Sequence, residues 1–349
     1  MLTVNYIDVL NKACDLTGLT RLSASLSSTD NAKLQTFISK RLENAVRYHF
    51  WPDYMRLEQR RFKADYASGT PYAAPTTTVA TVIYYPNSQK YYQNLVASTG
   101  NAPATLASGA YVTNLAYWAE AATAYSGSDW AASTAYTQGT IVRNPSDGYF
   151  YQCHTAHTSS SSFDSTKFGA LVPFDRFIAY AQAAQTVIGD VVQVWSSNPR
   201  VYKSALEVGF ELSQNGIQIC DAYNSVWVWY RIVIPRLSGD TFSPTATYAV
   251  GNQVYFSSAT VAGNFYDCVA TTSAGESPSS AAAKWSIVNL PRMFEDYMAY
   301  GAYVDSLTGD GQMDKARAEE ARLMGWLARE VGILTRQEQQ QQRARVLVR

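Results

Sequence analysis

The side chains best suited to metal chemistry are those of Cys153, His154 and His157, which lie within one Ser- and Thr-rich stretch. A thiolate and two imidazoles at this spacing can bind zinc, but a fourth ligand is needed and the neighbouring sequence indicates none. Cys268, which occupies the matching position in a related segment described below, has no histidine beside it. We therefore expect Cys153 to pack in a core, and we predict neither a metal site nor a cofactor.

Other catalytic arrangements are missing from the sequence. It contains no phosphate-binding loop, no dinucleotide fingerprint and no H-E-x-x-H pattern. Glycoside hydrolysis needs two facing carboxyl groups, and acidic residues are sparse in the aromatic-rich middle of the chain. His49 is the only further histidine, so a serine or cysteine nucleophile lacks an obvious base. The sequence predicts a protein that is not an enzyme.

Composition narrows the classes of partner. The chain has 349 residues, of which 47% are hydrophobic, so it can bury a substantial core. Its 28 basic and 28 acidic residues cancel, which argues against a nucleic-acid-coating protein. No signal peptide is expected, and no apolar run approaches the ~20 residues of a membrane span. We interpret the four scattered cysteines as buried thiols.

Helical patterns occupy both ends of the chain. Apolar residues recur at helical spacing over 6–13 and 34–49 near the N-terminus, and over 294–304 and 313–334 near the C-terminus. A Gly-Asp-Gly sequence at 309–311 separates the last two helices. These patterns predict that both chain ends contribute to one helical body.

The stretch between the helices is typical of short strands and turns. Strands are predicted at 191–195 (VVQVW), 217–220 (IQIC) and 226–234 (VWVWYRIVI), and we expect these three to share one sheet. The predicted fold class is therefore α+β. It combines a helical body built from both chain ends, a small antiparallel β-sheet, and two or three small all-β modules inserted into it.

An internal repeat is the most specific feature of the sequence. Trp130, Tyr136, Gly139 and Val142 match Phe242, Tyr248, Gly251 and Val254 in order and spacing, and Tyr-x-Cys and a closing aromatic follow in both segments. A degenerate third copy over 79–121, closing at Trp118, is left open. The repeated aromatics form the core of each module or, alternatively, an exposed platform on which sugar rings stack. The candidate residues for either role are Trp130, Tyr136, Tyr151, Tyr248, Tyr266 and Trp285.

The pattern W-x5-Y-x2-G-x2-V, followed by Y-x-C and a final aromatic, resembles small chitin- and cellulose-binding modules. The resemblance covers 127–171 and 241–289. Phe242 stands where that family usually has its first Trp, and Phe168 stands where the last Trp is usual. The resemblance implies a carbohydrate-binding-like β fold, and the two replacements weaken the expectation of sugar binding.

The rest of the chain resembles the head-to-tail connector, or adaptor, proteins of tailed bacteriophages, of the tail tubular protein A type. The residues that carry this resemblance are Phe50-Trp51-Pro52 after the N-terminal helices, the V-x-V-x-Y strand ending at Tyr230, and Asp310, Gly311, Lys315 and Ala316 after the proline-led helix. It covers 1–75, 172–240 and 288–335, which we expect to form one connector body.

The connector resemblance implies a structural virion protein, assembled in the host cytoplasm and located in the neck between capsid and tail. Its expected partners are identical subunits in a ring, commonly a dodecamer, the portal protein, a downstream tail protein, and DNA passing through the lumen without sequence-specific contacts. The alternative is a non-enzymatic protein that binds surface glycans. Residues 336–349 are predicted to be an extended tail. The candidate portal-binding residues are Arg336, Arg343, Arg345, Val346, Leu347 and Arg349.

Overall fold

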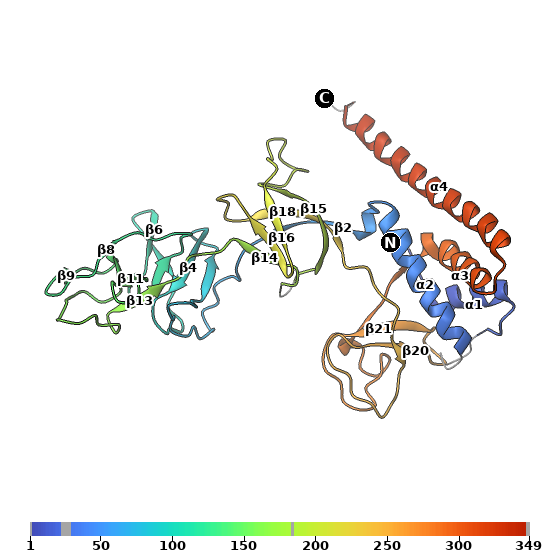
Figure 1. Cartoon of the computed structure of the whole chain (residues 1–349), viewed down its shortest axis with the longest axis horizontal. Coiled ribbons are helices and arrows are strands. Elements are labelled where there is room, and N and C mark those ends of the chain that lie inside the picture. The colour runs from blue at the N-terminus through green and yellow to red at the C-terminus, as the bar shows by residue number, and fades with distance from the viewer. Residues whose placement is uncertain (1, 22–28, 183–184, 347–349) are drawn as a thin grey trace. The chain divides into compact units, whose positions relative to one another are not determined.

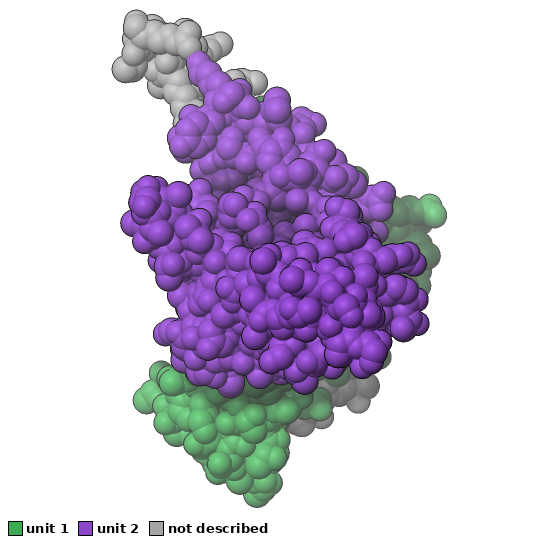
Figure 2. Space-filling view, turned by 90° about the vertical axis from the view of Figure 1, so that its left-hand side faces the viewer, with its two compact units in different colours: residues 1–55, 233–349 green, residues 56–232 purple. Residues whose placement is uncertain are grey.

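The computed structural model describes residues 2–21, 29–182 and 185–346, with side chains over 2–21, 31–182 and 185–337. Helices and small, mostly antiparallel sheets follow one another along the chain, which confirms the predicted α+β class (Figure 1). The chain divides into two compact units, which Figure 2 distinguishes by colour. Unit 1 comprises 1–55 and 233–349, and unit 2 comprises 56–232.

Unit 1 is built from four α-helices of the described chain. They are α1 (Tyr6–Thr17), α2 (Thr29–Tyr48), α3 (Glu295–Gly309) and α4 (Met313–Val346). Helices α1, α2 and α4 each pack against α3, and strand β1 (Thr3–Val4) pairs with β23 (Leu290–Pro291). Gly18 ends α1 with a left-handed φ of 75°, which glycine adopts without steric cost. The expected association of the two chain ends is confirmed.

One buried ionic cluster connects three of these helices. The Arg41 guanidinium on α2 donates to both Asp305 carboxylate oxygens on α3, at 2.9 and 2.8 Å, and to Glu320 on α4, at 2.8 Å. Gly301 leaves room for the Arg41 side chain, because a Cβ there would collide with it. Burial acts to lower the pKa of Arg41, but the bonds to the two carboxylates outweigh it and raise the pKa above its usual value.

Helix α4 corrects the expectation for the C-terminal tail. The amphipathic pattern predicts a helix that ends at Leu334 and an extended segment over 336–349, whereas the helix continues to Val346. The physical reason is local: Arg, Gln, Glu and Ala are good helix formers, and neither Gly nor Pro follows Gly332. Leu347 and Arg349 lie outside the described residues.

In unit 2, the three strands expected to share one sheet lie in two separate three-stranded sheets. Strands β15 (Ile188–Trp195), β18 (Val226–Ile232) and β2 (Met55–Arg60) form the first, in the order β15-β18-β2. Strands β14 (Phe177–Ala179), β17 (Gly216–Ile219) and β16 (Phe210–Ser213) form the second, in the order β14-β17-β16. The prediction that IQIC shares a sheet with the other two strands was wrong, because a two-residue hairpin pairs β17 locally with β16. Both sheets contribute to one core.

The expected connector body is divided between the units. Residues 56–75 and 172–232 belong to unit 2, while the module over 241–289 belongs to unit 1. The cause is the continuity of the core: Phe174, Ile178 and Val228 form one cluster with Tyr84 and Tyr91, which lie in the first β module.

Three β modules, here called repeats 1, 2 and 3, occupy 64–121, 127–171 and 239–288. Repeat 2 contains β8 (Ser128–Asp129), β9 (Ala135–Tyr136), β10 (Ile141–Arg143), β11 (Phe150–Cys153), β12 (His157–Thr158) and β13 (Phe168–Leu171). Repeat 3 contains β19 (Asp240–Thr241), β20 (Gln253–Phe256), β21 (Asn264–Cys268) and β22 (Trp285–Ile287). Their sheets have the same order, β13-β11-β10-β8 and β22-β21-β20-β19, and in each the earliest strand in the chain pairs in parallel with its neighbour, β8 with β10 and β19 with β20.

Repeat 1 is a true copy that begins earlier than 79. It contains β3 (Val82–Tyr85), β4 (Lys90–Asn94) and β7 (Trp118–Glu120), with an added hairpin of β5 (Ala104–Ala107) and β6 (Ala110–Thr113). Its Tyr66 N–H donates to the Tyr84 carbonyl at 2.8 Å, as Trp130 and Phe242 donate to the equivalent carbonyls at 2.8 Å. Tyr72 follows Tyr66 at the same spacing as Tyr136 follows Trp130. The module start was missed because tyrosine replaces the first tryptophan.

The Arg41 cluster predicts a large effect of a single substitution. Arg41→Ala should destabilise the α2–α3–α4 packing by about 3–5 kcal/mol, because it leaves the Asp305 carboxylate buried without its partner. Hydrogen exchange of α2 and α3 amides and thermal unfolding measure this change. The matched control on the same helix is Arg47→Ala, which removes only the exposed pair with Glu43 and should change stability little. Equal effects of the two substitutions would contradict the assignment.

Candidate functional site

The C-terminal part of α4 is the first candidate site, because it leaves the body of unit 1. The last buried side chain of α4 among the described ones is Leu327, at 1% exposure, while Ile333 is 37% exposed and Arg336 is exposed. At 1.5 Å per residue the backbone from Leu327 to Val346 spans about 28 Å. Figure 1 shows α4 running on beyond α3 towards the C-terminus. Arg343, Arg345 and Val346 are placed on this helix by their backbone alone.

The aromatic candidates of repeat 2 form its interior. Tyr136, Tyr151 and Phe168 are buried together with Cys153, and Trp130 packs against this cluster half-buried. The Tyr151 hydroxyl donates to Asp147 Oδ2 at 2.7 Å. Burial, followed by the adjacent Asp147 carboxylate, raises the pKa of Tyr151 well above its usual value. These contacts describe a packed core rather than a binding surface.

Repeat 3 arranges its aromatics in the same way. Trp285 is buried at 7% exposure with Val254 and Cys268, and its indole N–H donates to the Glu276 carbonyl at 3.0 Å. Tyr248 and Tyr266 are half-buried against this cluster. None of the six predicted aromatics is exposed. Their positions agree with the interpretation that they form module cores and disagree with an exposed platform for sugar stacking.

The outer face of each repeat sheet has a second role, which was not predicted from the sequence. In repeat 1, Tyr91 on this face stacks on Phe174 of the unit 2 core, with ring centroids 4.8 Å apart. In repeat 2, Ile141 and Phe150 pack on Leu95 and Ala119 of repeat 1.

Repeat 3 uses the same face against a helix. Tyr6 of α1 lies edge-on to Phe265 at 4.7 Å and to Tyr255 at 5.9 Å. The Tyr6 N–H donates to Asn264 Oδ1 at 2.7 Å, and the Ile7 N–H donates to the Gly263 carbonyl at 3.0 Å. The sequence signal was present, since Tyr91, Phe150 and Phe265 each precede the inward tyrosine of the Y-x-C motif or its equivalent. One face of a common fold therefore attaches every repeat to its support.

The cysteine and histidine group is engaged in local bonds. Cys153 Sγ donates to the Thr155 carbonyl at 3.1 Å and lies 3.9 Å from His157 Nδ1, which itself lies 2.9 Å from the same carbonyl. Burial, with Lys167 adding to it, lowers the pKa of His154. Among the described residues no three Cys, His, Asp or Glu side chains are grouped to hold a metal ion.

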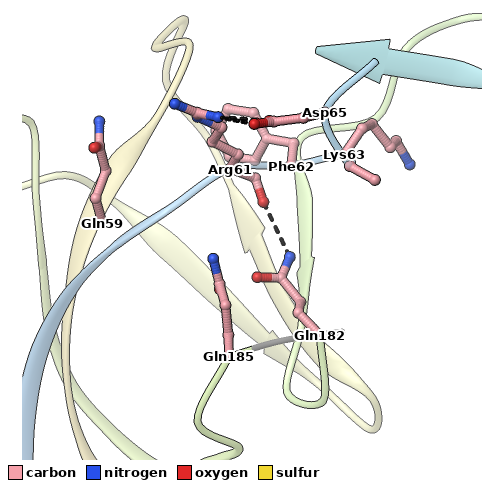
Figure 3. Close-up of a pocket in the computed structure, with 8 residues that line it drawn as sticks. Gln59, Arg61, Phe62, Lys63, Asp65, Gln182 and Gln185 are labelled. Carbon is pink, nitrogen blue, oxygen red and sulfur yellow. Dashed lines mark hydrogen bonds and ion pairs between the residues drawn. The ribbon is translucent and has the colours of Figure 1, made fainter. Parts of the chain in front are cut away.

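A polar hollow of about 720 Å³ lies in unit 2 beside the start of repeat 1 (Figure 3). Arg61 forms an ion pair with Asp65 at 2.7 Å, and its carbonyl accepts a bond from Gln182 Nε2 at 3.0 Å. The Arg61 guanidinium also lies over the Tyr84 ring, 4.3 Å from its centroid. The described residues that line the hollow include no His, Ser or Cys, and they offer no nucleophile with a base.

Comparison with known proteins gives no match, whether to protein-family models, to curated proteins or to solved structures. Within the part of the chain that the structure describes, no helix combines the length and the apolar character that crossing a membrane requires.

The burial of the repeat aromatics predicts the outcome of Trp130→Ala. Removing this indole from the cluster of repeat 2 should lower the free energy of unfolding by about 3 kcal/mol, because it leaves a cavity beside Phe163. Chemical denaturation followed by tryptophan and tyrosine fluorescence measures this. Tyr149→Ala, at an exposed position of the same repeat, is the control and should be nearly neutral. Unchanged stability of Trp130→Ala together with lost binding on a glycan array would support the platform instead.

Proposed function

We propose that this chain is a structural subunit of a head-to-tail connector ring of a tailed bacteriophage. In this role it docks under the portal protein in the neck of the virion, contacts identical subunits and a downstream tail protein, and forms part of the channel through which DNA passes. The proposal rests on the order of sequence features at the two chain ends, and the geometry of unit 1 supports it.

The observation that carries the proposal is the projecting part of α4. The backbone of α4 extends about 28 Å past Leu327, the last buried side chain of this helix among the described ones. The described side chains beyond it, up to Gln337, are exposed or half-buried, so they gain little from their own chain and are available to another molecule. The Arg41 cluster holds the N-terminal part of the same helix to α2 and α3, so the projecting part starts from a fixed position on these helices. A rigidly based, exposed helix suits an assembly protein better than an enzyme.

The repeats suit the same role as peripheral modules. Each has an aromatic core of its own and is attached through one sheet face, so it can be inserted in a loop without interrupting the helices. Ring closure would use two different faces of the subunit, as heterologous interfaces require.

The alternative, a glycan-binding protein without enzymatic activity, finds less support. It would use the repeat aromatics as stacking surfaces, and all six candidates are buried or half-buried. A weaker mode of sugar binding through the loops of the repeats would be detected by the glycan array described for Trp130→Ala.

Electron microscopy of the purified chain mixed with the portal protein of the same virion tests the ring. We expect closed rings of identical subunits, attached to one end of the portal, with twelve subunits as the commonest number for this kind of ring. The portal alone and the chain alone are the controls, since a ring that closes only on the portal is consistent with the proposal. A mixture that yields only unattached monomers at micromolar concentration would refute it.

Deletion of Thr335 to Arg349 tests the docking role of α4. We expect the truncated chain to fold with an unchanged melting temperature, because Leu327 is the last buried side chain of α4 among those the structure describes, and to lose its attachment to the portal. Co-sedimentation with the portal measures attachment, and circular dichroism measures folding. Unchanged attachment would show that the docking surface lies elsewhere.

A further inference from the structure

The cations of α4 repeat at a constant interval. Lys315, Arg322, Arg329, Arg336 and Arg343 are each seven residues apart, and all five lie on the one continuous helix. Seven residues are nearly two turns, so these five positions share one face of the helix and are spaced about 10.5 Å apart along its axis. The first four are exposed. The helix therefore carries a line of positive charge, here called the basic stripe, along its length.

Only the first two cations of the basic stripe have partners among the described residues. Lys315 Nζ lies 5.5 Å from the centroid of the Tyr303 ring, and Arg322 lies 3.7 Å from Glu319, one helical turn away. For Arg329 and Arg336 the described part of the chain supplies no ion pair. The positive charge that lacks a partner is thus concentrated in the part of α4 that leaves the body of unit 1.

A hollow of about 380 Å³ between α3 and α4 runs beside the basic stripe. Glu319, Arg322, Trp326 and Arg329 are among the residues that line it from α4, and Asp296 and Tyr300 line it from α3. Asp296 is already paired with Lys12 of α1. The hollow adds apolar ring surface beside the charges, as a protein partner requires.

We propose that the basic stripe of α4 binds an acidic α-helix of a partner protein, whose carboxylates recur every seven residues along one face. This inference rests on the proposed docking role of α4 and specifies the chemistry of the surface it meets.

The spacing favours a helix over other anions. A strict seven-residue interval stays in register with a second helix, because two such helices wind around each other with a left-handed twist. Along a DNA strand charges recur every ~3.4 Å, so cations about 10.5 Å apart would meet only one phosphate in three. A second copy of α4 is excluded as the occupant of this face, because the two lines of positive charge would repel each other.

Binding of a synthetic peptide to the full-length chain tests the proposal. The probe is a labelled helical peptide of about four heptads with Glu at every seventh position, and the control probe has the same composition with those Glu residues off one face. We expect the first peptide to bind with an affinity that falls as salt rises, and the second to bind much more weakly. The readout is fluorescence anisotropy.

Variants of the chain locate the binding surface. R322A/R329A/R336A should weaken binding of the acidic peptide about tenfold, which corresponds to the loss of three exposed ion pairs. The matched control K33A/K40A/R317A removes three other exposed cations of unit 1 and should leave binding unchanged. R322E/R329E/R336E should reject the acidic peptide and bind a Lys-substituted version, which shows that the altered chain is folded.

Three results would overturn the proposal. They are equal binding of both peptides, equal losses in the two alanine variants, and displacement of the peptide by random duplex DNA that depends on the same arginines. The last result would identify a nucleic acid as the partner. Peptide binding without any ring or portal attachment would refute the proposed function and leave this inference standing, so the two failures can be told apart.

Discussion

The contact on which unit 1 depends is the bidentate bond between Arg41 and Asp305, extended to Glu320. It joins an N-terminal helix to two C-terminal helices across more than 260 positions of sequence. The Arg41 side chain is 7% exposed and that of Asp305 is 13% exposed, so leaving either without its partner is costly, whereas Glu320 is 37% exposed and contributes less. The cluster therefore joins α2 to α3 and helps to hold the first part of α4, from which the basic stripe extends.

In each repeat, one face of the sheet forms the core of the module and the other face attaches the module to its neighbour. On the inner face of each sheet, a tyrosine and an aromatic at the closing strand pack into a core that belongs to one repeat alone, as Tyr136 and Phe168 do. On the outer face, the side chains pack against a different neighbour in each repeat. Repeat 1 packs on the core of unit 2, repeat 2 packs on repeat 1, and repeat 3 packs on α1. A strand alternates its side chains between two faces, so a single short sheet can serve both purposes. Copies of one module can therefore be carried by quite different supports.

The helix packing of unit 1 and the two-faced sheets of the repeats together suit a protein that assembles with other proteins. The helical unit supplies a helix that is held at Glu320 and carries Arg329 and Arg336 without an ion pair among the described residues. The repeats add compact modules, of which repeat 3 packs on α1. In the polar hollow of unit 2, by contrast, Gln182 donates to the Arg61 carbonyl, and in the Cys153 group the thiol and His157 Nδ1 both lie against the Thr155 carbonyl. The proposed connector role accordingly rests on α4 and on the helices that hold it.

The sequence alone was sufficient for the α+β class, the helical patterns at both ends and the matching pair of repeats, because each depends on local periodicity or on spacing kept twice. It was insufficient for the sheet that β17 joins, for the start of repeat 1 at a tyrosine, and for the division of the expected body between two units. Those features depend on which distant apolar segments pack into the same core. Which strands pair with each other in a sheet cannot be read from the order of residues along the chain. The length of α4 could have been inferred from its helix-forming residues. The burial of the repeat aromatics, however, was decided only by tertiary packing, since the same side chains would build either a core or a platform.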